Sequence, residues 1–270
     1  MRFYKYHGAG NDFILVDQRT AHPLAKDHTG LIARLCERRF GIGADGLILL
    51  QQKPGFDFEM VYFNADGRES SLCGNGGRCI AAFAQKLGII REKCRFWAID
   101  GEHEAVVAPD GQWVELHMGD VRDMDFDQNA CVLNTGSPHY VVFRSMVDKI
   151  DVREEGAAIR FNERYRTTGI NVNFVQDLGD ALLVRTYERG VEDETLACGT
   201  GVTAAALAHH REARKPAGLH ETTVRARGGV LKVRYTAHAD GHFTNVWLCG
   251  PARFVYEGFV SLEQETLNTQ

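Results

Sequence analysis

The chain has 270 residues, of which 44% are hydrophobic and 25% are charged, so it can form one large domain or two of about 130 residues. A formal net charge of -5 and an isoelectric point near 6.1 argue against a surface that coats nucleic acid. The sequence has no apolar run of the roughly 20 residues that a membrane helix needs, and no apolar core of a signal peptide at its amino terminus. We therefore expect a cytoplasmic protein with neither a nucleic-acid nor a membrane partner.

The expected secondary structure is mostly strand. Short β-rich runs, taken in chain order, predict strands at 12–17, 46–52, 57–63 and 139–143, and hairpins at 173–187 and 230–248. Helices are fewer. The spacing of apolar residues predicts a helix over 31–40 that ends at Gly41, and two helices that are apolar nearly all round follow Cys73 and Cys198. A helix without a polar face is expected to be enclosed by other structure.

An internal repeat organises these elements. The segment GAGNDFILV matches NTGSPHYVVF, with Gly10 aligned on Gly136, and the segment that leads to Cys73 matches the one that leads to Cys198 at almost the same spacing. Several landmarks recur in the same order, so we expect two lobes of similar fold. The first lobe spans 1–120 and carries Cys73, and the second spans 121–270 and carries Cys198, with the alternative that the last strand returns to the first lobe.

Each repeat places a cysteine at the start of an apolar helix, within a glycine-rich turn. A helix amino terminus lowers the pKa of a thiol, so a cysteine there is expected to act as a base near neutral pH. Glycines beside it allow backbone N–H groups to approach a carboxylate closely. One such cysteine alone is more often structural, but two that face each other across a cleft suit inversion at a carbon acid, where one thiolate removes a proton and the opposite thiol supplies one.

Other sites have little support in the sequence. The chain has an odd number of cysteines without CxxC spacing and eleven histidines without an HExxH motif, so neither a disulfide framework nor a metal site is predicted. It also lacks GxGxxG and Walker sequences. We expect the seven cysteines to be reduced and most of them to be buried: Cys36, Cys73, Cys79, Cys94, Cys131, Cys198 and Cys249.

The motifs HGAGNDF, FNADGRES, CGNGGRC, GSPHYVVF and YERGVEDETLACGTG, in this order, make the chain resemble the diaminopimelate epimerase family over essentially its whole length. CGTG alone would also fit the related proline racemases, whereas FNADG with YERG and a second CGNG fits the epimerases better. The resemblance implies an α/β (α+β) fold of two pseudo-symmetric lobes, each a curled, mostly antiparallel sheet around a hydrophobic helix. It also implies interconversion of L,L- and meso-diaminopimelate, in the lysine and peptidoglycan route, without pyridoxal phosphate or metal.

The resemblance further implies roles for individual residues. Cys73 and Cys198 would be the acid/base pair, with His139 and Glu188 close to the reacting groups. Arg189 would pair with a carboxylate, the distal one, and Glu188 with an ammonium group. The full set implied to bind substrate is Asn11, Asn64, Gly74, Asn75, Asn171, Glu188, Arg189, Gly199 and Thr200.

Two positions depart from the family pattern. Gly46 stands where many members have a glutamine that contacts substrate, and Ser137 replaces a usual asparagine. Both positions belong to the polar surroundings of the site, so they leave the thiol chemistry intact and raise the question of substrate fit. A site that loses an amide must use a water, a neighbour or a different ligand.

Two other functions stay open from the sequence. One is a cofactor-independent racemase for another amino acid, such as proline, hydroxyproline or histidine, which the charged pair Glu188 and Arg189 disfavours. The other is a two-lobed binding protein without enzymatic activity, for which paired thiols would be an unusual requirement. In each case the expected partner is a small molecule, an amino acid for either enzyme, and a homodimer is left open.

Overall fold

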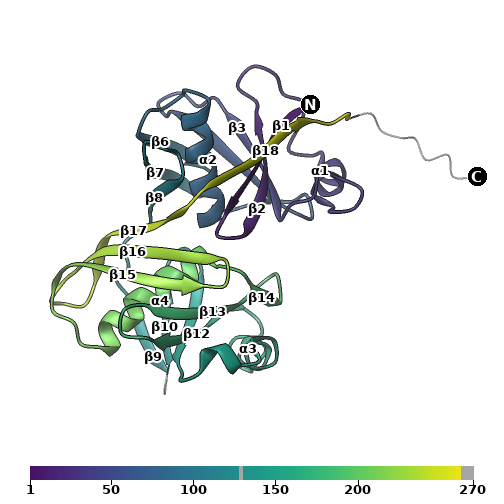
Figure 1. The fold of residues 1–270 in the computed structure, drawn as a ribbon. Helices are drawn as coiled ribbons and strands as arrows, with labels where there is room; N and C mark the ends of the chain where they lie inside the picture. Colours follow the sequence, from purple (N-terminus) through teal and green to yellow (C-terminus); the bar gives the residue numbers. More distant parts are fainter. Residues whose placement is uncertain (128–129, 263–270) are drawn as a thin grey trace, which may run out of the picture.

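The computed structural model describes residues 1–127 and 130–262, which form two lobes that repeat one topology (Figure 1). The elements of the first repeat are β1 (Arg2–Gly8), β2 (Asn11–Asp17), α1 (Thr29–Cys36), β3 (Gly46–Gln51), β4 (Phe58–Asn64), β5 (Glu69–Ser70), α2 (Gly74–Lys86), β6 (Lys93–Ala98), β7 (Gly101–Val107) and β8 (Trp113–His117). Those of the second repeat are β10 (Ala130–Asn134), β11 (Pro138–Phe143), a 3₁₀ turn η1 (Val147–Lys149), α3 (Val152–Arg160), β12 (Asn171–Asp177), β13 (Leu182–Glu188), β14 (Asp193–Thr195), α4 (Gly199–Glu212), β15 (Gly218–Ala226), β16 (Gly229–Ala237) and β17 (Phe243–Pro251).

Two further strands complete the sheets by exchange between the repeats. β9 (Met124–Asp127) pairs with β10, and β18 (Arg253–Phe259) returns across the first lobe to pair with β1, as the yellow strand in Figure 1 shows. The strand order is therefore β18-β1-β2-β3-β4-β6-β7-β8 in one lobe and β9-β10-β11-β12-β13-β15-β16-β17 in the other. Among the described strands, only the pairs β2/β3, β4/β6, β11/β12 and β13/β15 are parallel. The predicted mixed, mostly antiparallel fold with an internal repeat is confirmed.

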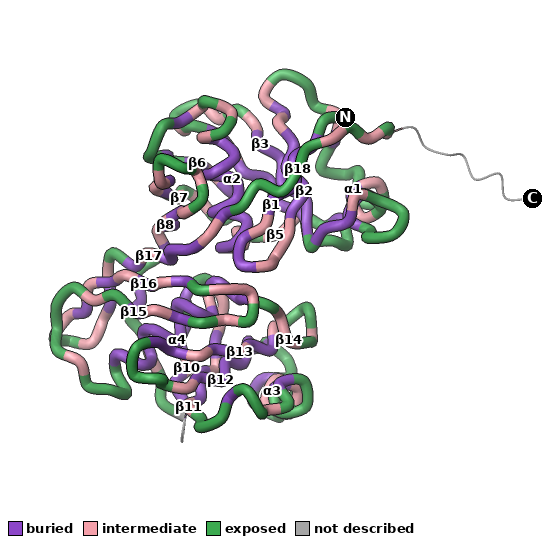
Figure 2. Tube along the Cα trace, viewed as in Figure 1, coloured by how far each residue is buried: buried purple, intermediate pink, exposed green. Residues whose placement is uncertain are grey.

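The central helix of each lobe is enclosed by its curled sheet. Every residue of α2 from Gly74 to Ala84 is buried, and so is every residue of α4 from Gly201 to His210 (Figure 2). Both helices contribute to one large cluster of buried apolar residues that continues from lobe to lobe. The sequence predicted that α2 and α4 are enclosed because they lack a polar face, and the sheets around them confirm this prediction. Among the described residues, no helix is long and apolar enough to cross a membrane.

The predicted end of the first helix is wrong. α1 ends at Cys36 rather than at Gly41, because Glu37 takes an extended backbone conformation (φ -67°, ψ 130°). The carboxylate of Glu37 then accepts hydrogen bonds from the backbone N–H groups of Arg39 and Phe40. A side chain that satisfies nearby backbone donors in this way stabilises a turn in competition with the helix.

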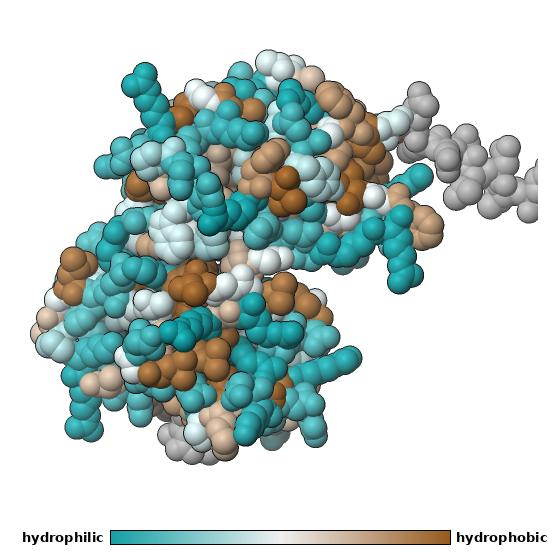
Figure 3. Space-filling view, in the orientation of Figure 1, coloured by the Kyte–Doolittle hydropathy of each residue, from teal (hydrophilic) through white to brown (hydrophobic). Residues whose placement is uncertain are grey.

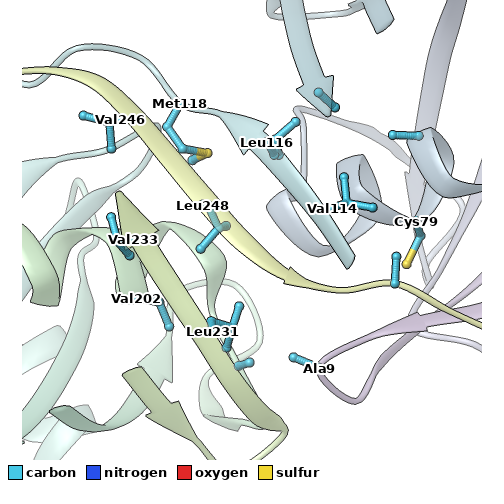
Figure 4. Packing of buried hydrophobic residues seen from close by; sticks show 14 of the residues in the cluster. Ala9, Cys79, Val114, Leu116, Met118, Val202, Leu231, Val233, Val246 and Leu248 are labelled. Carbon is cyan, nitrogen blue, oxygen red and sulfur yellow. The ribbon is translucent and has the colours of Figure 1, made fainter. Parts of the chain in front are cut away.

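The lobes are joined by a strand pair that also supports both helix starts. β8 of the first lobe pairs with β17 of the second, with Leu116 opposite Leu248, and Figure 4 shows Leu248 within the apolar cluster between the lobes. A β-carbon built on Gly74 would lie 3.0 Å from Leu248 Cδ2, and one on Gly199 would lie 2.8 Å from it. Leu248 therefore packs directly against the first residue of both central helices.

We predict that Leu248→Ala lowers the free energy of unfolding by about 2–5 kcal/mol, because it opens a cavity at a fully buried position shared by both lobes. Leu219→Ala is the matched control, since Leu219 is 72% exposed, and it should change stability by less than about 0.5 kcal/mol. Urea unfolding followed by circular dichroism measures both. Equal effects of the two substitutions would contradict the packing role of Leu248.

Candidate active site

The two cysteines occupy matching positions where the lobes meet. Cys73 precedes α2 and Cys198 precedes α4, and both have an extended backbone, with φ of -90° and -97°. The first residues of the helices, Gly74 and Gly199, lie back to back: a β-carbon on Gly199 would be 3.5 Å from the Gly74 Cα. Figure 3 shows the surface notched between the lobes. The structure thus brings together the two glycine-rich turns that the sequence repeat predicted.

A directed chain of amides surrounds Cys73. Asn11 Oδ1 accepts hydrogen bonds from the Cys73 thiol, at 3.4 Å, and from Asn75 Nδ2, at 3.2 Å. Asn11 Nδ2 donates to the Asp45 carboxylate at 2.7 Å, which fixes the orientation of the Asn11 amide because a carboxylate can only accept. Asn75 Nδ2 also crosses to the other lobe and donates to the Ala197 carbonyl at 2.9 Å. The Asn75 side chain is therefore committed to protein partners in this structure.

A second chain leads to Cys198. His139 is fully buried, and its Nε2 lies 2.8 Å from Thr200 Oγ1, which lies 3.4 Å from Cys198 Sγ. Burial first, and the charge of Arg189 second, lower the pKa of His139 to about 3, so the imidazole is neutral. Its Nδ1 accepts from Asn173 Nδ2 at 3.0 Å, so the ring proton is on Nε2 and points to Thr200. The Thr200 hydroxyl is then free to donate to Cys198.

The charged group predicted for the distal end of a substrate is held in place on the second lobe. The Arg189 backbone N–H donates to Asn171 Oδ1 at 2.8 Å, and its Nη2 donates to Ser137 Oγ at 3.4 Å. Asn171 Nδ2 also donates to Ser137 Oγ, at 2.9 Å. Ser137 therefore links the two residues, and its own hydroxyl proton is available to a ligand because both donors use its lone pairs.

Glu188 lies at the end of β13, beside Cys198. Burial raises the pKa of the Glu188 carboxyl, and the neighbouring Thr195 hydroxyl and Cys198 thiol oppose that rise. A partly buried carboxylate without a cationic side chain in contact is suited to an ammonium group, which would restore its charge balance. No ion pair of Glu188 occurs within the described ranges.

The predicted net lowering of the thiol pKa values is wrong, although the helix starts act in the predicted direction. Burial raises the pKa of Cys73, and hydrogen bonds from the backbone N–H groups of Gly76 and Asn75 only oppose this. Burial also raises the pKa of Cys198, and the Glu188 carboxylate adds to the rise. Removal from water disfavours a thiolate by more than the helix amino terminus favours it, a balance that the sequence could not show.

Asn64 and Gly46 end up opposite each other at the strand ends of β4 and β3. Asn64 is exposed at the end of its strand, and it joins neither hydrogen-bond chain. A β-carbon on Gly46 would lie 2.6 Å from Tyr62 Cε2 and 3.1 Å from the Tyr62 hydroxyl, so the tyrosine ring takes the space of a longer side chain. Burial raises the pKa of Tyr62, and the nearby Cys73 and Glu188 add to the rise. The Tyr62 hydroxyl is therefore close enough to both residues to interact with them electrostatically.

Four residues of the site were missed in the sequence: Asp45, Tyr62, Arg78 and Asn173. Asn173 follows Asn171 by two residues on one strand, so the alternation of strand side chains could have placed both on one face. Arg78 falls within the motif CGNGGRC and Asp45 directly precedes Gly46, and nothing in the sequence marks either residue as part of a hydrogen-bond chain. The described part of the chain contains no group of three or more His, Cys, Asp or Glu side chains that could hold a metal ion.

Comparison with known proteins shows one family. A family model described as diaminopimelate epimerase matches residues 3–124 and 131–255. The chain is 48% identical to a diaminopimelate epimerase of Flavobacterium psychrophilum over 95% of its length and 99% of that protein, and 43% identical to one of Chlorobaculum tepidum over 94% and 99%.

Solved structures share the fold at low sequence identity. A PhzF-family phenazine biosynthesis protein of Bacillus anthracis has a TM-score of 0.76 at 13% identity, covering 97% of this chain and 99% of that one. A probable proline racemase of Agrobacterium radiobacter has a TM-score of 0.71 at 16% identity, covering 97% and 93%. At these identities the likeness establishes the two-lobed fold alone.

We predict that Tyr62→Phe raises KM by roughly 2- to 10-fold with a smaller effect on kcat, because it removes one hydroxyl from the site and leaves the ring that fills the space at Gly46. Tyr256→Phe makes the same change at an exposed position of the same lobe and should alter neither constant. Steady-state kinetics of both variants decide. An unchanged KM in Tyr62→Phe would show that its hydroxyl does not contact substrate.

Proposed function

The chain belongs to the diaminopimelate epimerase family, and on that premise we propose that Cys73 and Cys198 are the acid and base that interconvert L,L- and meso-diaminopimelate. Family membership makes the chain an isomerase that epimerises diaminopimelate in lysine biosynthesis. The observation that carries the assignment of the two thiols is their matched position at two helix amino termini that lie back to back.

The reaction inverts one carbon, so it needs a proton removed from one face and another supplied to the opposite face. One thiolate takes the α-proton, and the resulting carbanion is protonated by the thiol of the other lobe. The negative charge that develops on the substrate carboxylate lies at the starts of α2 and α4, where backbone N–H groups and the helix dipoles stabilise it. His139, being fully buried, acts on Cys198 through Thr200 and is a positioning residue.

The distal residues support a substrate with two charged ends. Glu188 suits an ammonium group, and Arg189, held by Asn171 and Ser137, suits a carboxylate. A proline or hydroxyproline ring has no second carboxylate, so it would leave Arg189 without its partner. This disfavours the alternative of a racemase for another amino acid.

The substrate assignment predicts a clear order in an amino-acid panel. The purified protein, without added cofactor, should convert L,L-diaminopimelate to the meso form and should turn over proline, hydroxyproline and histidine at least about 100-fold more slowly, because these lack the distal charged centre. Chiral chromatography of each reaction measures this. Faster racemisation of proline or of histidine would reject diaminopimelate as the main substrate, and no turnover of any of them would favour a binding protein.

The acid/base assignment predicts that Cys73→Ser and Cys198→Ser each lower kcat by roughly 100-fold or more while the protein stays folded, because an alcohol is a far weaker acid than a thiol. Cys249→Ser is the matched control, since Cys249 is buried and lies outside both hydrogen-bond chains; it should affect stability more than turnover. Initial rates and thermal melting of the three variants separate the effects. A stable Cys73→Ser variant that keeps near-normal kcat would remove Cys73 from the mechanism.

We also propose that the protein works in the cytoplasm with a small amino-acid substrate. All seven cysteines are free, which suits a reducing compartment. A homodimer stays a prediction, supported by β18, which pairs with β1 on one side and exposes Phe254, Val255 and Tyr256.

A further inference from the structure

Arg78 is a buried cation on the helix that begins directly after Cys73. It lies on α2, five residues after Cys73, and is fully buried. Its Nη2 donates to Asn75 Oδ1 at 2.7 Å, its Nη1 to the Gly74 carbonyl at 3.2 Å, and its Nε to the Pro251 carbonyl at 3.5 Å. All three acceptors are neutral, and the ion pairs formed by the described residues do not include Arg78. A buried charge without a counter-charge is strongly disfavoured, so its presence needs an explanation.

The fold makes room for this guanidinium. A β-carbon on Gly8, at the end of β1, would lie 3.3 Å from Arg78 Nη2, and one on Gly250, in β17, would lie 3.2 Å from Arg78 Nε. Both distances are tighter than ordinary van der Waals contact. Two glycines in strands from the two repeats therefore leave space for one side chain.

Hydrogen bonds connect Arg78 to Cys73 through two amides: Arg78 Nη2 donates to Asn75 Oδ1, and Asn75 Nδ2 donates to the Asn11 Oδ1 that also accepts from the Cys73 thiol. The groups that act on the Arg78 charge are the thiols of Cys79, Cys73 and Cys249, in decreasing order. Burial raises the pKa of Cys249 to about 12 and that of Cys79 further, so both stay protonated. Of these three thiols, Cys73 is the one that precedes a central helix and matches Cys198, where the proposed reaction requires a thiolate.

The repeat supplies an internal comparison. The residue of α4 that corresponds to Arg78 is Thr203, which also follows its cysteine by five residues. Thr203 Oγ1 donates to the Gly199 carbonyl at 3.1 Å, as Arg78 Nη1 donates to the Gly74 carbonyl. Both side chains therefore satisfy the same carbonyl in their own helix, but only Arg78 adds a charge.

We propose that Arg78 is the permanent counter-charge of the Cys73 thiolate, so that Cys73 ionises before Cys198 and the exchangeable proton stays on Cys198. This rests on the proposed roles of the two cysteines. Arg78 acts through Cys73 and does not touch the reacting carbon, so it is a positioning residue. Cys73 and Cys198 have similar backbone surroundings, and the charge of Arg78 makes their acidities unequal.

The other groups around the thiols are consistent with this order. The titratable and charged groups that interact electrostatically with Cys73 are Tyr62 of β4, Glu188 of β13, Cys198 before α4, and Arg78 and Cys79 of α2. Glu188 disfavours a thiolate at both cysteines, and at Cys198 it is the largest influence after burial, with only the Thr200 hydroxyl and one backbone N–H in opposition. The contact of Cys73 with Asn11 Oδ1 favours the thiol. The charge of Arg78 lowers the pKa of Cys73, by less than burial and Glu188 raise it, whereas the described groups that act on Cys198 do not include a cation.

The test measures each thiolate separately in the ligand-free protein. The protein is treated with iodoacetamide across a pH series, and peptide mass spectrometry gives the pH midpoint of alkylation at Cys73 and at Cys198. Midpoints are compared rather than rates, because the two thiols differ in exposure. The proposal expects the lower midpoint at Cys73, and a lower midpoint at Cys198 would overturn it without any variant.

Three substitutions then test the charge. Arg78→Met and Arg78→Gln should raise the Cys73 midpoint by about one pH unit or more, a tenfold loss of thiolate below the midpoint, and leave that of Cys198 in place. Arg78→Lys keeps the charge, so it should shift the Cys73 midpoint by less than about half of the shift seen with Met or Gln. Equal shifts in the Lys and Gln variants would overturn the proposal, since Gln retains a hydrogen-bond donor for Asn75 without the charge.

Thr203→Val is the matched control on α4, and it should move neither midpoint. Thermal melting shows which variants are folded. If Arg78→Met does not fold, the Arg78→Gln variant and the order of the Cys73 and Cys198 midpoints in the wild-type protein still test the proposal. Alkylation needs no substrate. The outcome is therefore independent of whether diaminopimelate is the substrate, and a failed turnover assay would leave this result standing.

Discussion

The close approach of two helix starts is the constraint on which the site depends. Gly74 and Gly199 lie back to back with Leu248 across them, so a side chain at either position would separate the lobes. Their neighbours Cys73 and Cys198 are consequently brought together by backbone packing rather than by contacts of the thiols themselves. The apolar core runs from one lobe into the other, and such a core can hold the two proposed acid/base groups at a fixed separation, which loosely joined domains could not do.

The same closeness creates an electrostatic problem. Cys198 is buried and Cys73 is half-buried, which raises the pKa of both thiols, and the Glu188 carboxylate adds to the rise. Backbone N–H groups at the helix starts reduce the penalty without adding a net charge. A bound substrate would bring an ammonium group to Glu188, so the charge balance of the site is completed by the ligand. Partial neutralisation by the ligand favours binding of a zwitterionic amino acid over that of a simple carboxylic acid.

The sequence predicts most of the framework because the framework repeats. Matching glycines and cysteines in one order predicted two lobes, and the helices after Cys73 and Cys198 were recognisable because they lack a polar face. Long-range relations could not be derived in this way. The end of α1 depends on one side chain of Glu37 turning back to the backbone, and the ring of Tyr62 fills the space at Gly46 only because β3 and β4 pair in this register. The sign of the thiol pKa shifts depends on burial, which exists only in the folded lobes.

The two repeats share a backbone but differ in the polar residues at equivalent positions, and the reaction itself accounts for that difference. At the inverted carbon the two faces need equivalent groups, and in the proposed mechanism these are the two cysteines at the two helix starts. Away from that carbon the substrate is not symmetric, since one side chain ends in a second charged centre. Equivalent positions accordingly diverge: Asn64 corresponds to Glu188 and Asn11 to Ser137. A symmetric scaffold can therefore bind an asymmetric substrate in one orientation, with the charged distal residues confined to the second lobe.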